Sequence, residues 1–157
     1  MALDFDGVDD IVTHSNITAI NGTAVFTVMF WIRMDARLSP RGLWDKFAVG
    51  NLGIASRQDD TIAVGGILDY FDAGGNQAKL GGLFTDGVLQ HHAVVFDGNG
   101  AANADRYKIY KDGTNQTLTF VGTIPATISS NTGTFKTGAS GAALAYSDCK
   151  IGLLKVW

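Results

Sequence analysis

The stretch that decides the fold runs from Val88 to Gly113 and reads VLQHHAVVFDGNGAANADRYKIYKDG. Both of its halves have the alternation of a half-buried strand, because successive strand side chains point to opposite faces. Between the halves, the sequence DGNG at 97–100 supplies residues that tolerate the positive φ angles of tight turns. The stretch therefore predicts a β-hairpin in which His91 and His92 face opposite sides of the sheet.

The composition extends the β prediction to the whole chain. With 157 residues, the chain fits the size of one domain, for which about 100–200 residues are usual, so we expect a single domain over 1–157. Twenty glycines and two prolines punctuate short runs of Val, Ile, Phe and Thr, which is typical of strands joined by turns. No helix of ordinary length is expected. The predicted class is all-β, either a sandwich or a barrel.

Charge and composition exclude several kinds of partner and chemistry. The net charge is -3 and the Lys and Arg residues are scattered, so nucleic acid is not an expected partner. The longest apolar run is far shorter than the roughly 20 residues that a membrane span needs. All 15 acidic residues are aspartate. Cys149 is the one cysteine, so no intrachain disulfide can form.

The first ten residues, MALDFDGVDD, lack the basic and apolar regions of a signal peptide. If Met1 is the natural start, we expect synthesis in the cytosol and no export by that route.

The strongest apolar strand is predicted from Val25 to Met34. Phe26, Val28, Phe30 and Ile32 share one of its faces, and Val25, Thr27, Met29 and Trp31 share the other. Because both faces are apolar, we expect a central strand with cover on each side.

Four blocks of the sequence, in order, resemble the laminin-G-like jelly-roll family of the concanavalin A-like lectin/glucanase superfamily. They are LDFDGVDDIV at 3–12, FTVMFWIRMD at 26–35, the hairpin pair HHAVVFDG and YKIYKDG, and KIGLLKVW at 150–157. The resemblance implies a two-sheet antiparallel jelly-roll β-sandwich, often with a structural calcium, that is used mostly for binding. One departure from the pattern is Gln90, where family members usually carry Trp before the two histidines.

Enzymes of the wider superfamily hydrolyse glycans with glutamates in an ExDxxE strand motif, which places nucleophile and acid on one face. A chain without glutamate cannot form this motif, and no Asp-x-Asp-x-x-Asp replaces it in a strand pattern. His91 and His92 cannot both ligate one metal from adjacent strand positions without a bulge. We therefore expect no catalytic activity.

Aromatic residues provide the predicted ligand site. The segment 69–77, DYFDAGGNQ, reads as a loop that carries Tyr70 and Phe71, and Trp44 lies in an earlier turn and short strand. Exposed rings can stack on the C–H face of a sugar, so Trp44, Tyr70 and Phe71 form a candidate stacking platform. The alternative is that these rings fold back to cap the sandwich.

Three aspartates of the opening turn, Asp6, Asp9 and Asp10, are the candidate metal ligands. Carboxylate oxygens suit calcium, and the family resemblance supports a site here. The alternative is that these side chains accept hydrogen bonds from local backbone N–H groups of the turn.

The sequence thus favours a non-catalytic binding or structural module. The leading hypothesis is an adhesive protein on a virion surface, such as a bacteriophage head-decoration or fibre domain, since phage proteins leave the cytosol by lysis. Its expected partners are other virion or surface proteins, glycans and further copies of the chain. The alternative is a carbohydrate-binding module of a secreted or cell-surface protein, with an extracellular location.

Overall fold

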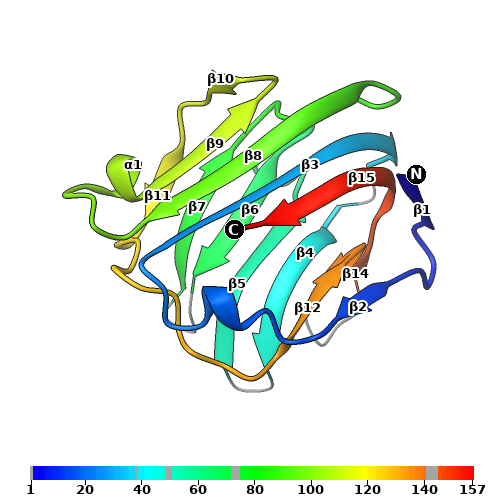
Figure 1. Ribbon diagram of the computed structural model, residues 1–157. Coiled ribbons are helices and arrows are strands. Elements are labelled where there is room, and N and C mark those ends of the chain that lie inside the picture. Colours follow the sequence, from blue (N-terminus) through cyan, green and yellow to red (C-terminus); the bar gives the residue numbers. More distant parts are fainter. Residues whose placement is uncertain (1, 38, 49–50, 72–74, 141–144) are drawn as a thin grey trace.

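The chain folds into two antiparallel β-sheets that face each other (Figure 1). The structure is a computed structural model that describes residues 2–37, 39–48, 51–71, 75–140 and 145–157. Sheet A contains, in spatial order, β1 (Ala2–Asp6), β15 (Asp148–Val156), β3 (Val25–Ala36), β8 (Leu89–Asp97), β9 (Tyr107–Lys111) and β10 (Thr114–Asn115). Sheet B contains β11 (Thr119–Val121), β7 (Asn76–Leu80), β6 (Ile67–Phe71), β5 (Asn51–Gln58), β4 (Arg41–Ala48), β12 (Thr134–Thr137) and β2 (Val12–His14).

The remaining elements are short. A small third sheet pairs β13 (Ala139–Ser140) with β14 (Ala145–Tyr146). One 3-10 turn spans Thr18–Ile20, and the four-residue α1 spans Asn103–Arg106. The expected all-β, two-sheet antiparallel sandwich with essentially no helix is confirmed. Within the described residues, no helix is long and apolar enough to cross a membrane.

The predicted hairpin is present as β8 and β9. Phe96 pairs with Tyr107 and His92 with Lys111. His92 is buried on the inner face, and His91 is half-buried on the outer face, as predicted. The connection differs from the expected loop, since α1 lies within it. Arg106, at the end of α1, donates to the carbonyl oxygens of Gly100 at 2.8 Å and Ile124 at 2.7 Å, which fixes the connection.

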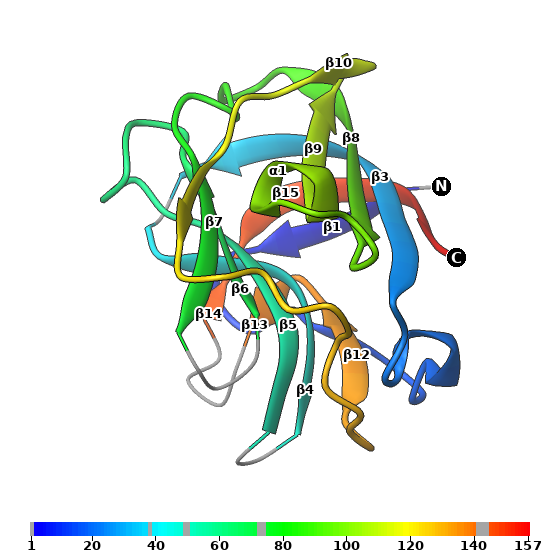
Figure 2. The same cartoon turned by 90° about the vertical axis from the view of Figure 1, so that its left-hand side faces the viewer.

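Aromatic rings pack between the two sheets, and Figure 2 shows the arrangement of these sheets from the side. The Phe71 ring from sheet B meets the Tyr107 ring from sheet A edge-on, with centroids 4.6 Å apart. Phe96 lies on the inner face of β8 and stacks on Phe26 of β3 at 5.2 Å. Burial of this apolar surface stabilises the fold at about 25 cal/mol per Å².

Strand β3 is central in sheet A, between β15 and β8. Its inner row is fully buried, as the alternation predicts. Its outer row is not, because the side chains of Val25 and Trp31 remain 52% and 39% exposed. The prediction that β3 has cover on each side is therefore wrong: the core lies on one side of it, and the other side faces outward.

Candidate ligand-binding site

Two of the three rings predicted to form a stacking platform lie in the core. Trp44 is 1% exposed and stacks on Phe135 with ring centroids 5.8 Å apart. Phe71 is 0% exposed, because it belongs to the inner row of β6 and not to a loop. Residues 72–74 of the expected loop lie outside the described residues. The predicted platform is therefore wrong for Trp44 and Phe71, which offer no ring face to a ligand.

Tyr70 lies on the outer face of β6, and its ring already has a partner. The guanidinium carbon of Arg57, on the adjacent strand β5, lies 4.6 Å from the ring centroid. Arg57 Nη2 donates to the Tyr70 hydroxyl at 2.5 Å and to Asp59 Oδ2 at 2.9 Å. The Arg57 guanidinium covers one face of the Tyr70 ring, so Tyr70 alone makes a poor stacking surface.

The structure brings the three predicted metal ligands together. Carboxylate oxygens of Asp6, Asp9 and Asp10 all lie within 4.8 Å of one another. Asp6 Oδ1 accepts from the Val8 N–H at 2.9 Å, and Asp10 Oδ2 accepts from the Asp6 N–H at 3.0 Å, so the alternative of local turn bonds also holds. These hard oxygen donors fit calcium, and calcium at this turn stays a prediction.

A further site, which the sequence analysis did not name, lies on the outer face of sheet A. It is a depression of about 350 Å³, a volume at the lower end of the range of small-ligand pockets. Strands β1, β3, β8 and β15 contribute its floor and rim. Its lining residues are Ala2, Trp31, Arg33, Leu89, Lys150, Gly152 and Leu153. We call it the Trp31 depression.

The position of Trp31 explains the open space. On one side, the ring of its cross-strand neighbour His91 contacts the indole at an interplanar angle of 61°, with centroids 5.2 Å apart. On the other side, its cross-strand neighbour is Gly152, which has no side chain. The indole is thus held from β8 and left open toward β15. A methyl group built at Gly152 would lie 3.7 Å from the Ala2 Cβ, an ordinary contact, so a larger side chain there would occupy the depression.

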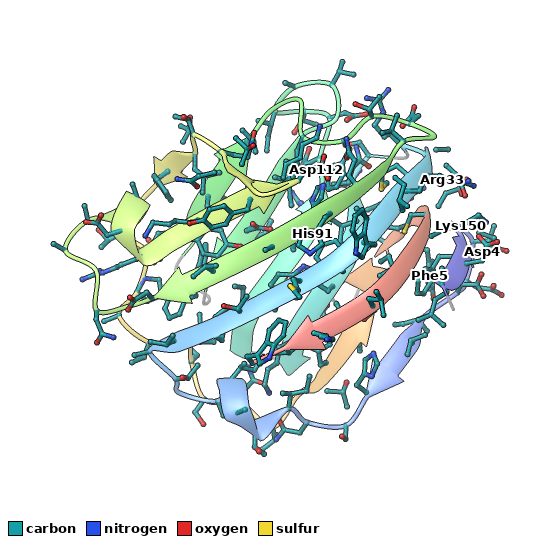
Figure 3. All side chains as sticks on the ribbon, turned by 45° about the horizontal axis from the view of Figure 1, so that its top comes forward. Asp4, Phe5, Arg33, His91, Asp112 and Lys150 are labelled. Carbon is teal, nitrogen blue, oxygen red and sulfur yellow. The ribbon has the colours of Figure 1, made fainter. Side chains whose placement is uncertain are left out.

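Charged side chains form the polar end of the depression (Figure 3). Arg33 donates from Nε to Asp35 Oδ1 at 2.8 Å, and its Nη2 lies 2.7 Å from the same oxygen. Lys150 pairs with Asp4 across β1 and β15, and its Nζ also lies 3.5 Å from Asp35 Oδ2. The side chains of Arg33 and Lys150 are 39% and 33% exposed. Both cations are therefore paired with carboxylates yet remain accessible to a ligand.

The depression combines three kinds of surface that a polyhydroxylated ring can use. The Trp31 face is apolar and flat, while Leu89 and Leu153 extend the apolar wall. Arg33 and Lys150 are hydrogen-bond donors, and their aspartate partners are acceptors. An arrangement of this kind can bind a ligand without transforming it, since it needs no nucleophile or general acid.

One sequence signal pointed toward this site. In FTVMFWIRMD, Trp31 falls on the row opposite Phe26 and Phe30, and both rows are apolar. An apolar outer row has two explanations, cover by another layer or a binding surface, and the sequence does not separate them.

Comparison with known proteins shows which solved structures share this fold. No protein-family model matches the sequence, and no curated protein matches it. Among solved structures, mouse laminin α1 domains LG4-5 match 99% of this chain at 13% identity, with a TM-score of 0.64. The galectin LEC-6 of Caenorhabditis elegans matches 99% of it at 9% identity, with a TM-score of 0.57. A Trypanosoma rangeli sialidase in complex with sialic acid matches 99% at 14% identity, with a TM-score of 0.68.

The concanavalin A-like jelly-roll fold is therefore confirmed. The shared part differs between these proteins. The chain spans 25% of the sialidase and 41% of the laminin fragment, whereas it spans 95% of the galectin.

Proposed function

We propose that this protein is a non-catalytic carbohydrate-binding module that holds a sugar ring against Trp31 on the outer face of sheet A. One observation carries the proposal: an exposed indole lies beside an open depression whose rim holds paired cations and carboxylates. The C–H face of a pyranose packs on such a ring. The sugar hydroxyls then exchange hydrogen bonds with Arg33, Lys150 and their aspartate partners.

The fold supports this proposal. Galectins and laminin LG domains are among the solved structures that share it. Fold similarity does not choose the binding surface, because many unrelated sites occur on one fold. The choice of the Trp31 depression rests on its geometry.

A glycan array, followed by calorimetry with the best binder, tests the proposal. We expect Trp31→Ala to weaken binding at least tenfold, and Gly152→Val to weaken it by filling the depression while leaving the indole in place. Trp157→Ala is the matched control, since Trp157 is also an exposed tryptophan but does not line the depression. Binding that survives both Trp31→Ala and Gly152→Val would rule out this site.

Attachment to the surface of a virus particle is a second candidate function. Exposed apolar side chains lie on the strands of sheet A and at their ends, and exposed apolar surface can mark protein–protein contacts as well as ligand sites. They are Leu3, Val25, Trp31, Val88, Leu89, Leu153 and Trp157. Co-purification with capsids, combined with no glycan bound at millimolar protein concentration, would favour this function over carbohydrate binding.

A further inference from the structure

We propose that the Trp31 depression takes uncharged saccharides and discriminates against acidic ones. The inference rests on the carbohydrate binding proposed above and names the class of sugar. The argument for it comes from the charged side chains around the depression and from the ion pairs that these side chains form.

The two cations at the depression already have anionic partners. Arg33 contacts Asp35 Oδ1 through both Nε and Nη2, and Lys150 contacts Asp4 and Asp35. A sugar carboxylate or sulfate that sought either cation would have to displace an aspartate or share its cation. A neutral hydroxyl needs no displacement, because each carboxylate oxygen accepts more than one hydrogen bond.

Further carboxylates lie at the same end of the outer face. Asp4 pairs in register with Lys150, and Asp6 with Asp148, so these side chains lie on neighbouring positions of β1 and β15. Burial raises the pKa of Asp148, and the nearby Asp35, Asp4 and Asp6 raise it further, whereas Lys150 lowers it. These carboxylates are therefore close enough to act on one another.

The balance of charge at this end is negative. Without Asp6, which is a predicted calcium ligand, three carboxylates, those of Asp4, Asp35 and Asp148, face two cations, those of Arg33 and Lys150, which leaves a net charge of 1-. Lys155 lies further along β15, beside Met29, and the net charge of the chain is -3. An acidic saccharide would thus approach a surface of its own sign, and exposed charges repel more strongly at low salt.

Matched saccharide pairs test the inference. The probes are neutral oligosaccharides on an array with their sialylated, sulfated or uronic acid counterparts, including lactose with 3′-sialyllactose. Calorimetry in 50 mM and 300 mM salt then follows the best neutral binder and its acidic partner. We expect the neutral sugar to bind at least tenfold tighter, which is about 1.4 kcal/mol. The ratio should shrink at the higher salt.

Two variants separate charge from contact. Asp148→Asn removes a carboxylate that does not line the depression, so it should raise the affinity for the acidic sugar and leave that for the neutral sugar unchanged. Asp97→Asn is the control, because Asp97 pairs with Val25 at the opposite end of β3 and should change neither.

The outcomes distinguish the two proposals. If an acidic saccharide binds as tightly as its neutral partner or tighter, and Trp31→Ala abolishes that binding, the selectivity is wrong and carbohydrate binding stands. If no saccharide of either class binds, the proposed function itself is wrong.

Discussion

Trp31 and Trp44 are the same residue type on two facing sheets, yet their surroundings give them different roles. Trp44 points inward from β4 and stacks on Phe135, so its ring stabilises the core. Trp31 points outward from β3, and its ring meets that of His91 at an interplanar angle of 61°. The pleat of the strand decides between these outcomes, because a shift by one residue moves a side chain to the other face. An exposed ring held in place by one neighbouring ring is preorganised for a ligand.

At the opening turn, calcium is predicted to bind Asp6, Asp9 and Asp10. Calcium at about 100 times its Kd should stabilise the fold by about 2.7 kcal/mol, which raises Tm by about 5–10 °C in a domain of this size. Differential scanning fluorimetry with and without chelator measures this. Asp10→Asn should abolish the response, and Asp86→Asn, an exposed carboxylate elsewhere, should keep it. A Tm that is unchanged on adding chelator would exclude the site.

Single polar residues were the hardest to place from the sequence. Gln90 occupies a position where the resembled family usually has Trp, and the structure gives it an inward place beside His92. Oriented for its neighbours, its amide oxygen accepts from Lys111 Nζ at 2.8 Å and its nitrogen donates to the Leu83 carbonyl at 3.3 Å. These two hydrogen bonds depend on Lys111 of β9 and on Leu83 in the loop before β8, which local alternation cannot reveal.

Among the elements, the two strands of the hairpin were predictable from the alternation of their side chains. The end of β6, whose inner row includes a buried polar residue, was not. The hairpin of β8 and β9 follows from its period of two and its Gly-rich turn. The last three residues of β6, Asp69 to Phe71, were expected to begin a loop, because Asp69 and the glycines after Phe71 resemble turn chemistry. Asp69 is instead buried on the inner row, where it accepts from the Tyr107 hydroxyl at 2.6 Å. Tertiary contact thus overrode the local signal.

Lys46 is a buried residue of β4 whose ammonium group hydrogen-bonds to two connecting segments. Its Nζ donates to Asn16 Oδ1 at 2.8 Å, in the segment between β2 and β3. It also donates to the carbonyl oxygens of Asn131 and Gly133, each at 3.1 Å, in the segment before β12. One ammonium on β4 therefore joins two connections that are far apart in sequence. Oxygen acceptors gathered around a buried cation lose their donors together when the cation is removed.

Replacing this ammonium should loosen both connections. Lys46→Met keeps most of the side-chain length but leaves the acceptors of Asn16, Asn131 and Gly133 without that donor. We expect the free energy of unfolding to fall by about 3 kcal/mol, measured by urea denaturation. Lys136→Met, at a half-buried lysine on β12, is the control and should cost less than about 1 kcal/mol. Equal losses of unfolding free energy in the two variants would show that the hydrogen bonds of Lys46 contribute nothing specific to stability.

In the molecule as a whole, two buried ionisable groups respond to pH in opposite directions. Burial raises the pKa of Asp69 from 3.8 to about 6, although the hydrogen bond from Tyr107 opposes the change. Burial lowers the pKa of His92 from 6.5 to about 4, and the charge of Lys111 adds to this effect. His92 is stacked on Phe84 at 5.0 Å, and within the described residues its ring nitrogens have no hydrogen-bond partner. Both groups are therefore neutral in the fold over much of the range between pH 4 and 6.

The sign of each contribution follows from linkage. Between pH 3.8 and about 6, the unfolded chain has lost the Asp69 proton that the fold retains, so the stability from this group is lost as pH rises. Between about 4 and 6.5, the unfolded chain carries a His92 proton that the fold excludes, so the stability from this group is gained as pH rises. At about 1.4 kcal/mol per pH unit, each change amounts to about 3 kcal/mol, and the two nearly cancel.

Single variants should make each of the two opposing pH dependences of the unfolding free energy measurable. Relative to the wild type, Asp69→Asn should gain about 3 kcal/mol of unfolding free energy between pH 4 and 6.5, because it removes only the falling contribution. His92→Phe should lose about as much over the same range, because it removes only the rising one. Urea denaturation at several pH values measures both, and comparison with the wild type cancels the other titrating groups. The double variant is the internal control, since its stability should follow that of the wild type at a constant offset. Slopes of the same sign in the two single variants would contradict the opposed pair, and with it the view that the sandwich holds both groups neutral.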